Sequence, residues 1–228
     1  MQKCLRYIGY GAIYSMLVIG FSCTKMDHTY EKFIAGGPIV YPGRPDSVLT
    51  FGGRERVLLQ WAVPTDLNVV KYKVFWNFGA DSLMVTGPKP GTADSMSVII
   101  DSVPEGSYSF SVYTYDQAGH KSVATSSIGN SYGEIFQESI ANRIYRKLKL
   151  DAKQDTLAAV WVGLDAKCIG TEWVYTGTDG QAKNYFSPID TATYIHAIDV
   201  TQPISYRSLF LPEVDAIDTF YTDLKIIQ

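Results

Sequence analysis

Hydrophobic and polar residues alternate over many short stretches of the chain, most clearly from Ser107 to Tyr115. Small or hydroxyl-bearing residues alternate there with aromatic and aliphatic ones, which is the period of two typical of a half-buried strand. Asp116 to Gly119 follows as a tight turn, because glycine can adopt positive φ and an aspartate side chain can accept hydrogen bonds from amides ahead of it. The pattern therefore predicts a strand, a corner and a return strand over Lys121 to Ser127.

The chain before this hairpin predicts a series of similar short strands. These are Val57–Trp61, Val69–Trp76, Ser82–Val85 and Met96–Ile100. Tyr41 to Pro45 suits an irregular edge strand, since its prolines cannot donate to a ladder. Trp61 is predicted to lie in the core. From Ser47 onward there are about seven strands in about 90 residues, as in an immunoglobulin-like sandwich.

The second half of the chain predicts further strands and one link whose structure stays open. The predicted strands are Leu157–Val162, Gly170–Thr176, Tyr194–Val200, Ser205–Leu211 and Asp218–Ile226, with a hairpin turn at Thr178 to Gly180. The link, Tyr132 to Leu150, fits a short helix or a strand, and a strand is favoured from Ile144 onward. Tryptophan and tyrosine recur at similar spacings in the two halves, which indicates a duplicated sandwich. The recurring residues are Trp61, Tyr72 and Tyr108, then Trp161, Trp173 and Tyr206.

The N-terminus has the features of an export signal. Lys3 and Arg6 precede a mainly apolar run from Tyr7 to Phe21. At about 15 residues this run is shorter than the roughly 20 that a stable membrane-spanning helix needs. Cys23 resembles the lipid-bearing cysteine of the bacterial lipobox, although Gly20 stands where the common pattern has leucine, as in looser Bacteroidetes boxes.

The lipobox resemblance implies a signal peptide over residues 1–22, a lipid on Cys23 and a tether over residues 23–38. The protein is then expected on the bacterial outer membrane, with the choice between its periplasmic and outward leaflets left open. Two or more acyl chains would hold it there essentially permanently, because each buried CH₂ adds about 0.8 kcal/mol. The alternative is a plain secretory signal with an incidental cysteine.

Composition and charge narrow the class of protein. The 228 residues are 46% hydrophobic and include 16 Tyr and 19 Gly, which favours short strands joined by turns. The net charge of -3 and the lack of a basic run argue against a nucleic-acid partner. Three cysteines give no disulfide framework, and Cys168 is expected to be an inert buried thiol. The three histidines lie far apart, so neither a metal site nor a cofactor is expected.

Several residues of the first half resemble the fibronectin type III module. They are Trp61, Tyr72, Val103-Pro104 ahead of Tyr108, and the D-x-x-G-x-x-S hairpin from Asp116 to Ser122. In that module the tyrosine at this corner hydrogen-bonds back to the loop before it. The predicted fold class is thus all-β, with two tandem immunoglobulin- or fibronectin type III-like β-sandwiches over residues 39–130 and 131–228. No Arg-Gly-Asp occurs, so the module's best-known recognition sequence is not carried over.

A set of short motifs resembles a family of Bacteroidetes lipoproteins in their joint order. The motifs are C-T-K-M-D at Cys23, Y-P-G-R-P-D-S at Tyr41, K-Y-K-V-F-W-N ending at Asn77, Y-T-Y-D-Q-A-G-H-K-S ending at Ser122, A-N-R at Ala141 and A-I-D-T-F at Ala216. The chain is thereby similar to domain-of-unknown-function family 4998 over nearly its whole mature length. The resemblance implies an accessory lipoprotein of the kind expected beside outer-membrane glycan-import systems. It assigns no catalytic residues.

Three function classes fit these features. The first is a non-catalytic protein that binds carbohydrate, or a partner in an import complex, through exposed aromatic rings on which sugars stack. Its candidate residues are Trp76, Trp173, Tyr175, Tyr185 and Phe186. The last two lie in a loop-like stretch, Ala182 to Pro188, whereas tryptophans in strands are more often core residues.

The second class is a glycan-active enzyme, and the third is a structural spacer or adhesin without a small ligand. A glycosidase needs two carboxyl groups at a defined separation. The available carboxylates are Asp165, Asp179, Asp190, Asp215 and Asp218, and nothing in the sequence selects a pair. No motif of serine hydrolases, zinc proteases or phosphate-binding loops occurs, so the chain is not expected to be an enzyme.

The lipid anchor gives the first testable prediction. Replacing Cys23 with Ser removes the thiol that would carry the diacylglycerol, so the protein should move from the membrane fraction to the soluble fraction. Fractionation of cells followed by immunoblotting measures the change. Unchanged retention in membranes would contradict lipidation at Cys23.

Overall fold

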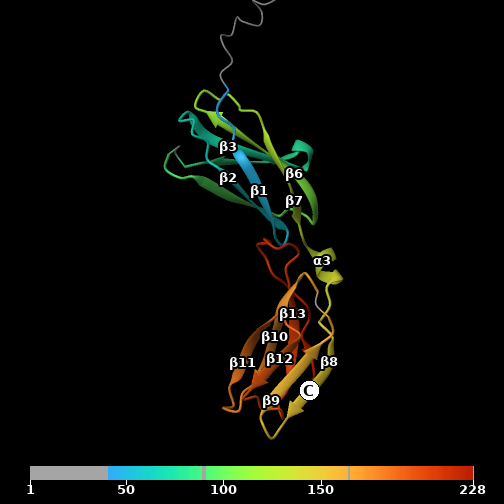
Figure 1. The fold of residues 1–228 in the computed structure, drawn as a ribbon. Helices are drawn as coiled ribbons and strands as arrows, with labels where there is room; N and C mark the ends of the chain where they lie inside the picture. Colours follow the sequence, from blue (N-terminus) through green and yellow to red (C-terminus); the bar gives the residue numbers. More distant parts are fainter. Residues whose placement is uncertain (1–40, 89–90, 164, 228) are drawn as a thin grey trace, which may run out of the picture. The chain divides into compact units, whose positions relative to one another are not determined.

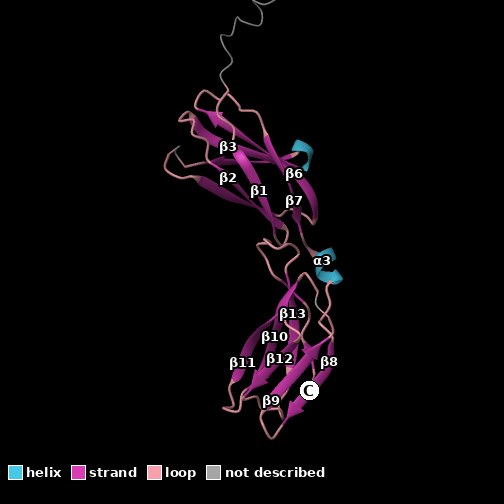
Figure 2. Ribbon diagram, in the orientation of Figure 1, coloured by secondary structure: helices cyan, strands magenta, loops and turns pink. Residues whose placement is uncertain are grey.

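Antiparallel strands make up most of the regular structure, as the alternating pattern predicts. The computed structural model describes residues 41–88, 91–163 and 165–227. The helical segments in these ranges are short: η1 (Asn77–Gly79), a single 3-10 turn, and α3 (Glu134–Ser139). Figure 2 shows both as small cyan elements beside the magenta strands. The all-β prediction is confirmed, whereas the signal peptide, Cys23 and the tether lie outside the described residues.

The first sandwich packs a three-stranded sheet on a four-stranded one. The three-stranded sheet has the order β1 (Asp46–Gly52), β2 (Arg56–Ala62), β5 (Ser95–Asp101). The four-stranded sheet has the order β4 (Asp81–Thr86), β3 (Val69–Trp76), β6 (Gly106–Asp116), β7 (Thr125–Ser131). Inward residues of both sheets form one core around Trp61, whose ring lies 5.4 Å from that of Tyr72. Figure 1 shows these strands coloured from blue to green.

The second sandwich repeats this strand order. Its three-stranded sheet has the order β12 (Ala192–His196), β9 (Thr156–Trp161), β8 (Tyr145–Asp151). Its other sheet has the order β11 (Ala182–Pro188), β10 (Cys168–Thr176), β13 (Ser205–Phe210), β14 (Phe220–Tyr221), and β15 (Lys225–Ile226) also pairs with β13. Trp161 and Trp173 thus occupy the strands equivalent to those of Trp61 and Tyr72. The duplication inferred from residue spacing agrees with this topology.

A tyrosine hydroxyl ties a strand to a preceding segment in each sandwich. Tyr108 Oη donates to the Pro104 carbonyl oxygen at 2.9 Å, which is the corner bond that the fibronectin type III resemblance implies. Tyr206 Oη donates to the Arg143 carbonyl oxygen at 2.6 Å, and its ring stacks on Trp173 at 5.0 Å. Tyr206 is fully buried, so this hydroxyl needs its partner.

The strand predicted over Tyr194 to Val200 is β12, which ends at His196, before Ala197 with its φ of 56°. The predicted strands differ from the observed ones at four further places. Tyr41 to Pro45 forms no strand, and β1 begins after Pro45, whose ring cannot donate to a ladder. The return strand begins at Thr125, because Ser122 Oγ accepts a hydrogen bond from the Thr114 amide and interrupts the ladder. The predicted strand over Asp218 to Ile226 is split into β14 and β15.

The fourth difference concerns the stretch expected to be loop-like, Ala182 to Pro188, which is strand β11. It pairs with β10 over the whole stretch from Gly170 to Thr176. The Thr178 to Gly180 turn returns the chain alongside β10, and Asp179 pairs with Lys183 at 2.9 Å across it. The loop prediction is therefore wrong, because regular pairing with β10 outweighs the polar composition of the stretch.

Residues remote in sequence join the two sandwiches within the compact unit that runs from Pro42 to Gln228. Asp218 accepts hydrogen bonds from Arg56 Nη2 at 2.5 Å and from the Arg54 amide at 2.8 Å. The Ile217 amide donates to the Gly52 carbonyl oxygen at 2.9 Å. Gly53 leaves room for this approach, since a Cβ there would lie 2.7 Å from Ile217 Cγ1.

Tyr206 gives a stability prediction. Tyr206→Phe leaves the Arg143 carbonyl oxygen buried without its donor, so the free energy of unfolding should fall by about 1–2 kcal/mol. Urea unfolding at neutral pH measures the loss, with Tyr194→Phe as the control because Tyr194 is 61% exposed. Equal midpoints for Tyr206→Phe and the wild type would contradict the role of the hydroxyl.

The same hydroxyl makes stability depend on alkaline pH. Burial raises the pKa of Tyr206 to about 12, above its value of roughly 10 in an unfolded chain. The protonated hydroxyl therefore stabilises the fold fully below pH 10, and this contribution is lost as the pH rises towards 12. The free energy of unfolding should therefore fall less steeply between pH 10 and pH 12 in Tyr206→Phe than in the wild type, by up to about 1.4 kcal/mol per pH unit. An equal slope in the two proteins would refute this.

The contacts of Asp218 and Ile217 with the first sandwich, which we call the joint, give a further stability prediction. The Arg56 guanidinium lowers the pKa of Asp218, so the contact stabilises the fold fully at neutral pH. This contribution declines as the pH falls below about 4, the ordinary pKa of an aspartate in an unfolded chain, and is lost as the pH falls through the lower pKa of the folded state. Asp218→Asn should speed hydrogen exchange at the Arg54 and Ile217 amides and leave amides of β3 unchanged. Mass spectrometry of exchanged peptides measures both regions. Equal rates at the joint in variant and wild type would show that Asp218 does not hold it.

Candidate functional site

The face of the first four-stranded sheet that points away from the core carries aromatic, hydroxyl and cationic side chains. Because Tyr72 and Val74 on β3 are buried, the alternate residues Lys73 and Phe75 point outward. The pairing registers extend this surface across all four strands. We call it the outer face; its strand residues are Lys71, Lys73, Phe75, Ser82, Met84, Thr86, Ser107, Ser109, Ser111, Tyr113, Tyr115, Ser126, Ile128 and Asn130.

Two aromatic rings lie together near the middle of the outer face. The rings of Phe75 and Tyr113 meet edge to face with centroids 5.6 Å apart. Lys73 Nζ lies 4.6 Å from the centroid of Phe75, and Lys121 Nζ lies 4.7 Å from that of Tyr113. The negative faces of the two rings attract cations, and each ring has an ammonium group beside it.

A third ring, Phe78, projects at the end of β3. Asn77 and Phe78 adopt φ values of 50° and 56°, an uncommon left-handed conformation for residues other than glycine. The side-chain Nδ2 of Asn77 donates to Asp81 Oδ2 at 3.0 Å and steadies this turn. Phe78 is fully exposed, at 108% of its reference area. Strained backbone that presents a bare aromatic ring is a feature found at binding sites.

Phe75, Phe78 and Tyr113 surround a shallow depression of about 560 Å³. The hydroxyls of Ser109 and Ser111 line it as well. Ser111 Oγ lies 2.9 Å from Ser126 Oγ, so these hydroxyls form a polar strip beside the rings. A surface with aromatic rings and neighbouring hydroxyls can hold the C–H face of a sugar and orient its hydroxyl groups.

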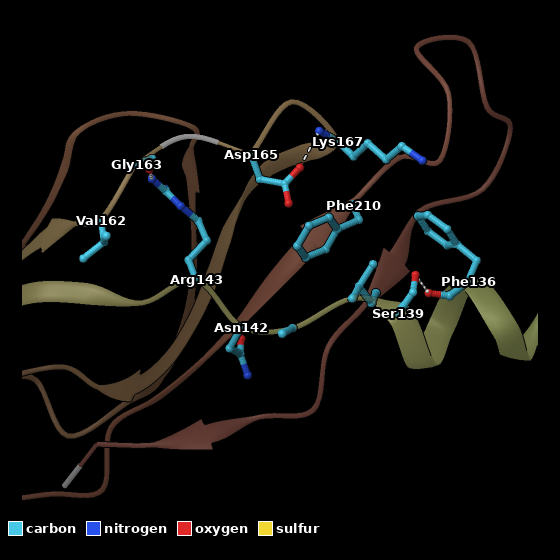
Figure 3. Close-up of a pocket in the computed structure, with 11 residues that line it drawn as sticks. Phe136, Ser139, Asn142, Arg143, Val162, Gly163, Asp165, Lys167 and Phe210 are labelled. Atoms are coloured by element: carbon cyan, nitrogen blue, oxygen red, sulfur yellow. Dashed lines mark hydrogen bonds between the residues drawn. The ribbon is translucent and has the colours of Figure 1, made fainter.

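A second depression, of about 380 Å³, lies beside α3 at one end of the second sandwich. Figure 3 shows Phe136, Phe210 and Lys167 around it, with Arg143 extending towards Gly163. Its walls combine rings, one carboxylate and two cationic groups. Among the described residues that line it, Asp165 carries the single carboxyl group, so these residues present no pair of the kind that a glycosidase uses.

Arg143, which lines this second depression, has a structural role. Its side chain is 8% exposed, Nη2 donates to the Asp190 carbonyl oxygen at 2.9 Å, and the guanidinium lies 4.5 Å from the Trp161 ring. Burial lowers the pKa of Arg143. Nη1 is buried and has no hydrogen-bond partner in the described part of the chain. Arg143 thus closes the end of the second core by covering Trp161 and binding a loop carbonyl.

The aromatic residues that the sequence suggests for carbohydrate binding lie in different parts of the structure. Trp173 is fully buried and Tyr175 is 8% exposed, so both belong to the second core. Trp76 packs against the first core. Tyr185 and Phe186 are 39% and 48% exposed, but they pair opposite Trp173 and Glu172 and so point to opposite faces of the sheet. Ligand binding by Tyr185 and Phe186 stays a prediction, and the two rings would contact ligands on opposite faces of the sheet.

Three of the five carboxylates named as catalytic candidates are engaged in structural contacts. Asp179 pairs with Lys183, Asp218 with Arg56, and Asp165 accepts from the Lys167 amide. Cys168 is buried, and burial raises the pKa of its thiol, as expected of an unreactive cysteine. Within the described ranges, no three His, Cys, Asp or Glu side chains gather as a metal site would require.

Sequence reasoning missed the three rings of the outer face. Tyr113 alternates with buried Val112 and Thr114, and Phe75 alternates with buried Val74, so strict application of the period would have turned both outward. The exposure of Phe78 has no such signal. It depends on the left-handed turn after β3, where the sequence indicates only that the chain turns.

Fold and surface together define a tandem fibronectin type III-like β-sandwich protein with an open candidate binding face. Residues 23–220 match the family DUF4998, a domain of unknown function, so the chain belongs to this family. No curated protein matches the sequence. Among the described residues, no helix is both long and apolar enough to cross a membrane.

Two solved structures from chicken are similar to the chain at low identity. One is a crystal structure of the CNTN1 FN1-FN3 domains, with 13% identity, a TM-score of 0.46 and coverage of 82% of this chain. The chain spans 65% of the length of that structure. The other is a two-domain fibronectin type III segment from tenascin, with 12% identity, a TM-score of 0.31 and coverage of 80% of this chain and 96% of that one.

Proposed function

We propose that this protein is a non-catalytic, lipid-anchored binding protein that holds an extended carbohydrate on the outer face of its first sandwich. The observation that supports this most directly is the fully exposed ring of Phe78 beside Phe75 and Tyr113. Exposed rings of this kind are costly in water and contribute binding energy when a ligand covers them. The shallow, open shape suits a polymer chain better than a small enclosed ligand.

The anchor and the location belong to the same proposal. A lipid on Cys23 would hold the protein on the bacterial outer membrane, and residues 23–38 would form the tether to the first sandwich. A protein fixed beside a transport system in this way would raise the local concentration of its glycan. Contact with a protein of that system is the other use open to the same surface.

A spacer function is the second candidate, and the joint favours it. Side-chain contacts support the main-chain bond between Gly52 and Ile217: Arg56 with Asp218, and Tyr132 Oη with Glu213 at 2.5 Å. A protein whose work is to project a partner needs such a joint but no ligand. This function predicts that the outer face tolerates substitution without loss of activity in cells.

The carbohydrate proposal is tested by loss of the projecting ring. Phe78→Ala should weaken binding of the full-length, detergent-purified protein to its glycan by about 3- to 10-fold, because an aromatic contact contributes about 0.5–1.5 kcal/mol. A glycan array identifies the ligand, and titration calorimetry measures the change. The Phe78 side chain is fully exposed, so the variant should unfold at the wild-type urea concentration.

Matched variants of the second sandwich locate the site. Tyr194→Ala, at a 61% exposed tyrosine on β12, should leave affinity unchanged. If Tyr185→Ala or Phe186→Ala weakens binding while Phe78→Ala does not, the ligand lies on β11 and the outer-face proposal fails. Absence of binding to every glycan would reject the carbohydrate function and favour the spacer.

A further inference from the structure

The charge of the outer face is opposite to that of the protein as a whole. The chain carries a formal net charge of -3. Yet the outward positions of β3, β4, β6 and β7 include Lys71 and Lys73 and no Asp or Glu, and Lys121 lies over the same surface. The surface therefore combines rings, hydroxyls and positive charge.

The carboxylates at the borders of the outer face are already engaged. Asp81 accepts from Asn77 at 3.0 Å, and Asp116 lies 2.7 Å from His120 Nδ1. Glu213, from the second sandwich, accepts from Asn130 at 2.6 Å and from Tyr132. These contacts hold the acidic groups at the ends of the strands.

The lysines of the outer face lack carboxylate partners among the described residues, whereas two lysines of the second sandwich have them. Lys149 pairs with Asp151 at 3.0 Å and Lys183 with Asp179 at 2.9 Å. Lys73 and Lys121 instead rest on aromatic rings, a contact of only about 0.5–1 kcal/mol at exposed sites. An anionic group of a ligand would attract these ammonium groups more strongly, through charge-assisted hydrogen bonds.

We infer that the outer face selects an acidic polysaccharide, one that bears carboxylate or sulfate groups. This inference rests on the proposed carbohydrate function. When Lys73 and Lys121 swing from their rings to the anionic groups, they uncover the faces of Phe75 and Tyr113 for the sugar rings. One movement thus provides both charge recognition and stacking surface.

An anionic membrane suits this face less well than a polysaccharide. Basic surfaces that bind acidic lipids use clusters of about 4–8 Lys or Arg. The outer face has fewer cations, and its hydroxyl strip of Ser107, Ser109 and Ser111 matches the many hydroxyl groups of a sugar chain. Membrane binding is nevertheless a distinct outcome of the test below.

The test compares charged polymers with their uncharged counterparts. The probes are polygalacturonate against its methyl ester and dextran sulfate against dextran, each titrated into the full-length protein in detergent. At least one charged polymer should bind about 10-fold or more tightly than its uncharged form, and the difference should shrink as salt screens the charges. Anionic phosphatidylglycerol vesicles serve as the membrane arm and should bind more weakly.

Paired variants identify the lysines responsible. Lys73→Gln with Lys121→Gln should remove most of the preference for charged polymer, whereas Lys149→Gln with Lys183→Gln, which changes the net charge equally, should retain it. Equal binding of charged and uncharged polymers would overturn the inference but leave the carbohydrate function intact if Phe78→Ala still weakens binding. Tighter binding to vesicles than to any polymer would also overturn it. Failure of every polymer and array glycan to bind would reject the carbohydrate function itself.

Discussion

The alternation of side chains along a strand is the constraint on which both the fold and the candidate site depend. Each residue that enters the core of the first sandwich forces its neighbours outward. Val74 and Val112 are fully buried, and Phe75 and Tyr113 follow them directly on β3 and β6. Because β3 pairs with β6 in a fixed register, burial of the valines brings the two outward rings within 5.6 Å of each other. The same packing that stabilises the fold therefore builds the surface.

The two sandwiches share a topology but differ on the equivalent outward faces. In the second sandwich, Arg207 on β13 pairs with Glu172 at 2.5 Å and lies 4.3 Å from the ring of Tyr221. The Arg207 guanidinium and the Glu172 carboxylate thus form an ion pair between neighbouring strands. On the first sandwich the lysines have no such partners among the described residues, and Phe78 stands free. The two equivalent faces therefore differ in the partners of their cations: a carboxylate on the second sandwich and aromatic rings on the first.

Local pattern predicted the strands well wherever alternation was strong. Val69 to Trp76 matches β3 at both ends, and the corner bond of Tyr108 follows from the fibronectin type III resemblance. The pattern did not predict the edge strand over Ala182 to Pro188. Most of this stretch is polar, and its strand conformation comes from pairing with β10. The pattern also failed for the site, because the exposure of Phe78 depends on two left-handed residues. Contacts between distant residues, such as Arg56 with Asp218, carry no local signal at all.

If polysaccharide covers the outer face, hydroxyl-radical footprinting will detect it as protection of the residues on that face. Phe78 and Met84, which are 108% and 51% exposed, should be oxidised readily in the free protein. Saturating glycan should protect these two residues and Tyr113, while Tyr194 on the second sandwich, at 61% exposure, keeps its rate of oxidation. Protection of Phe186 with no change at Phe78 would contradict the account.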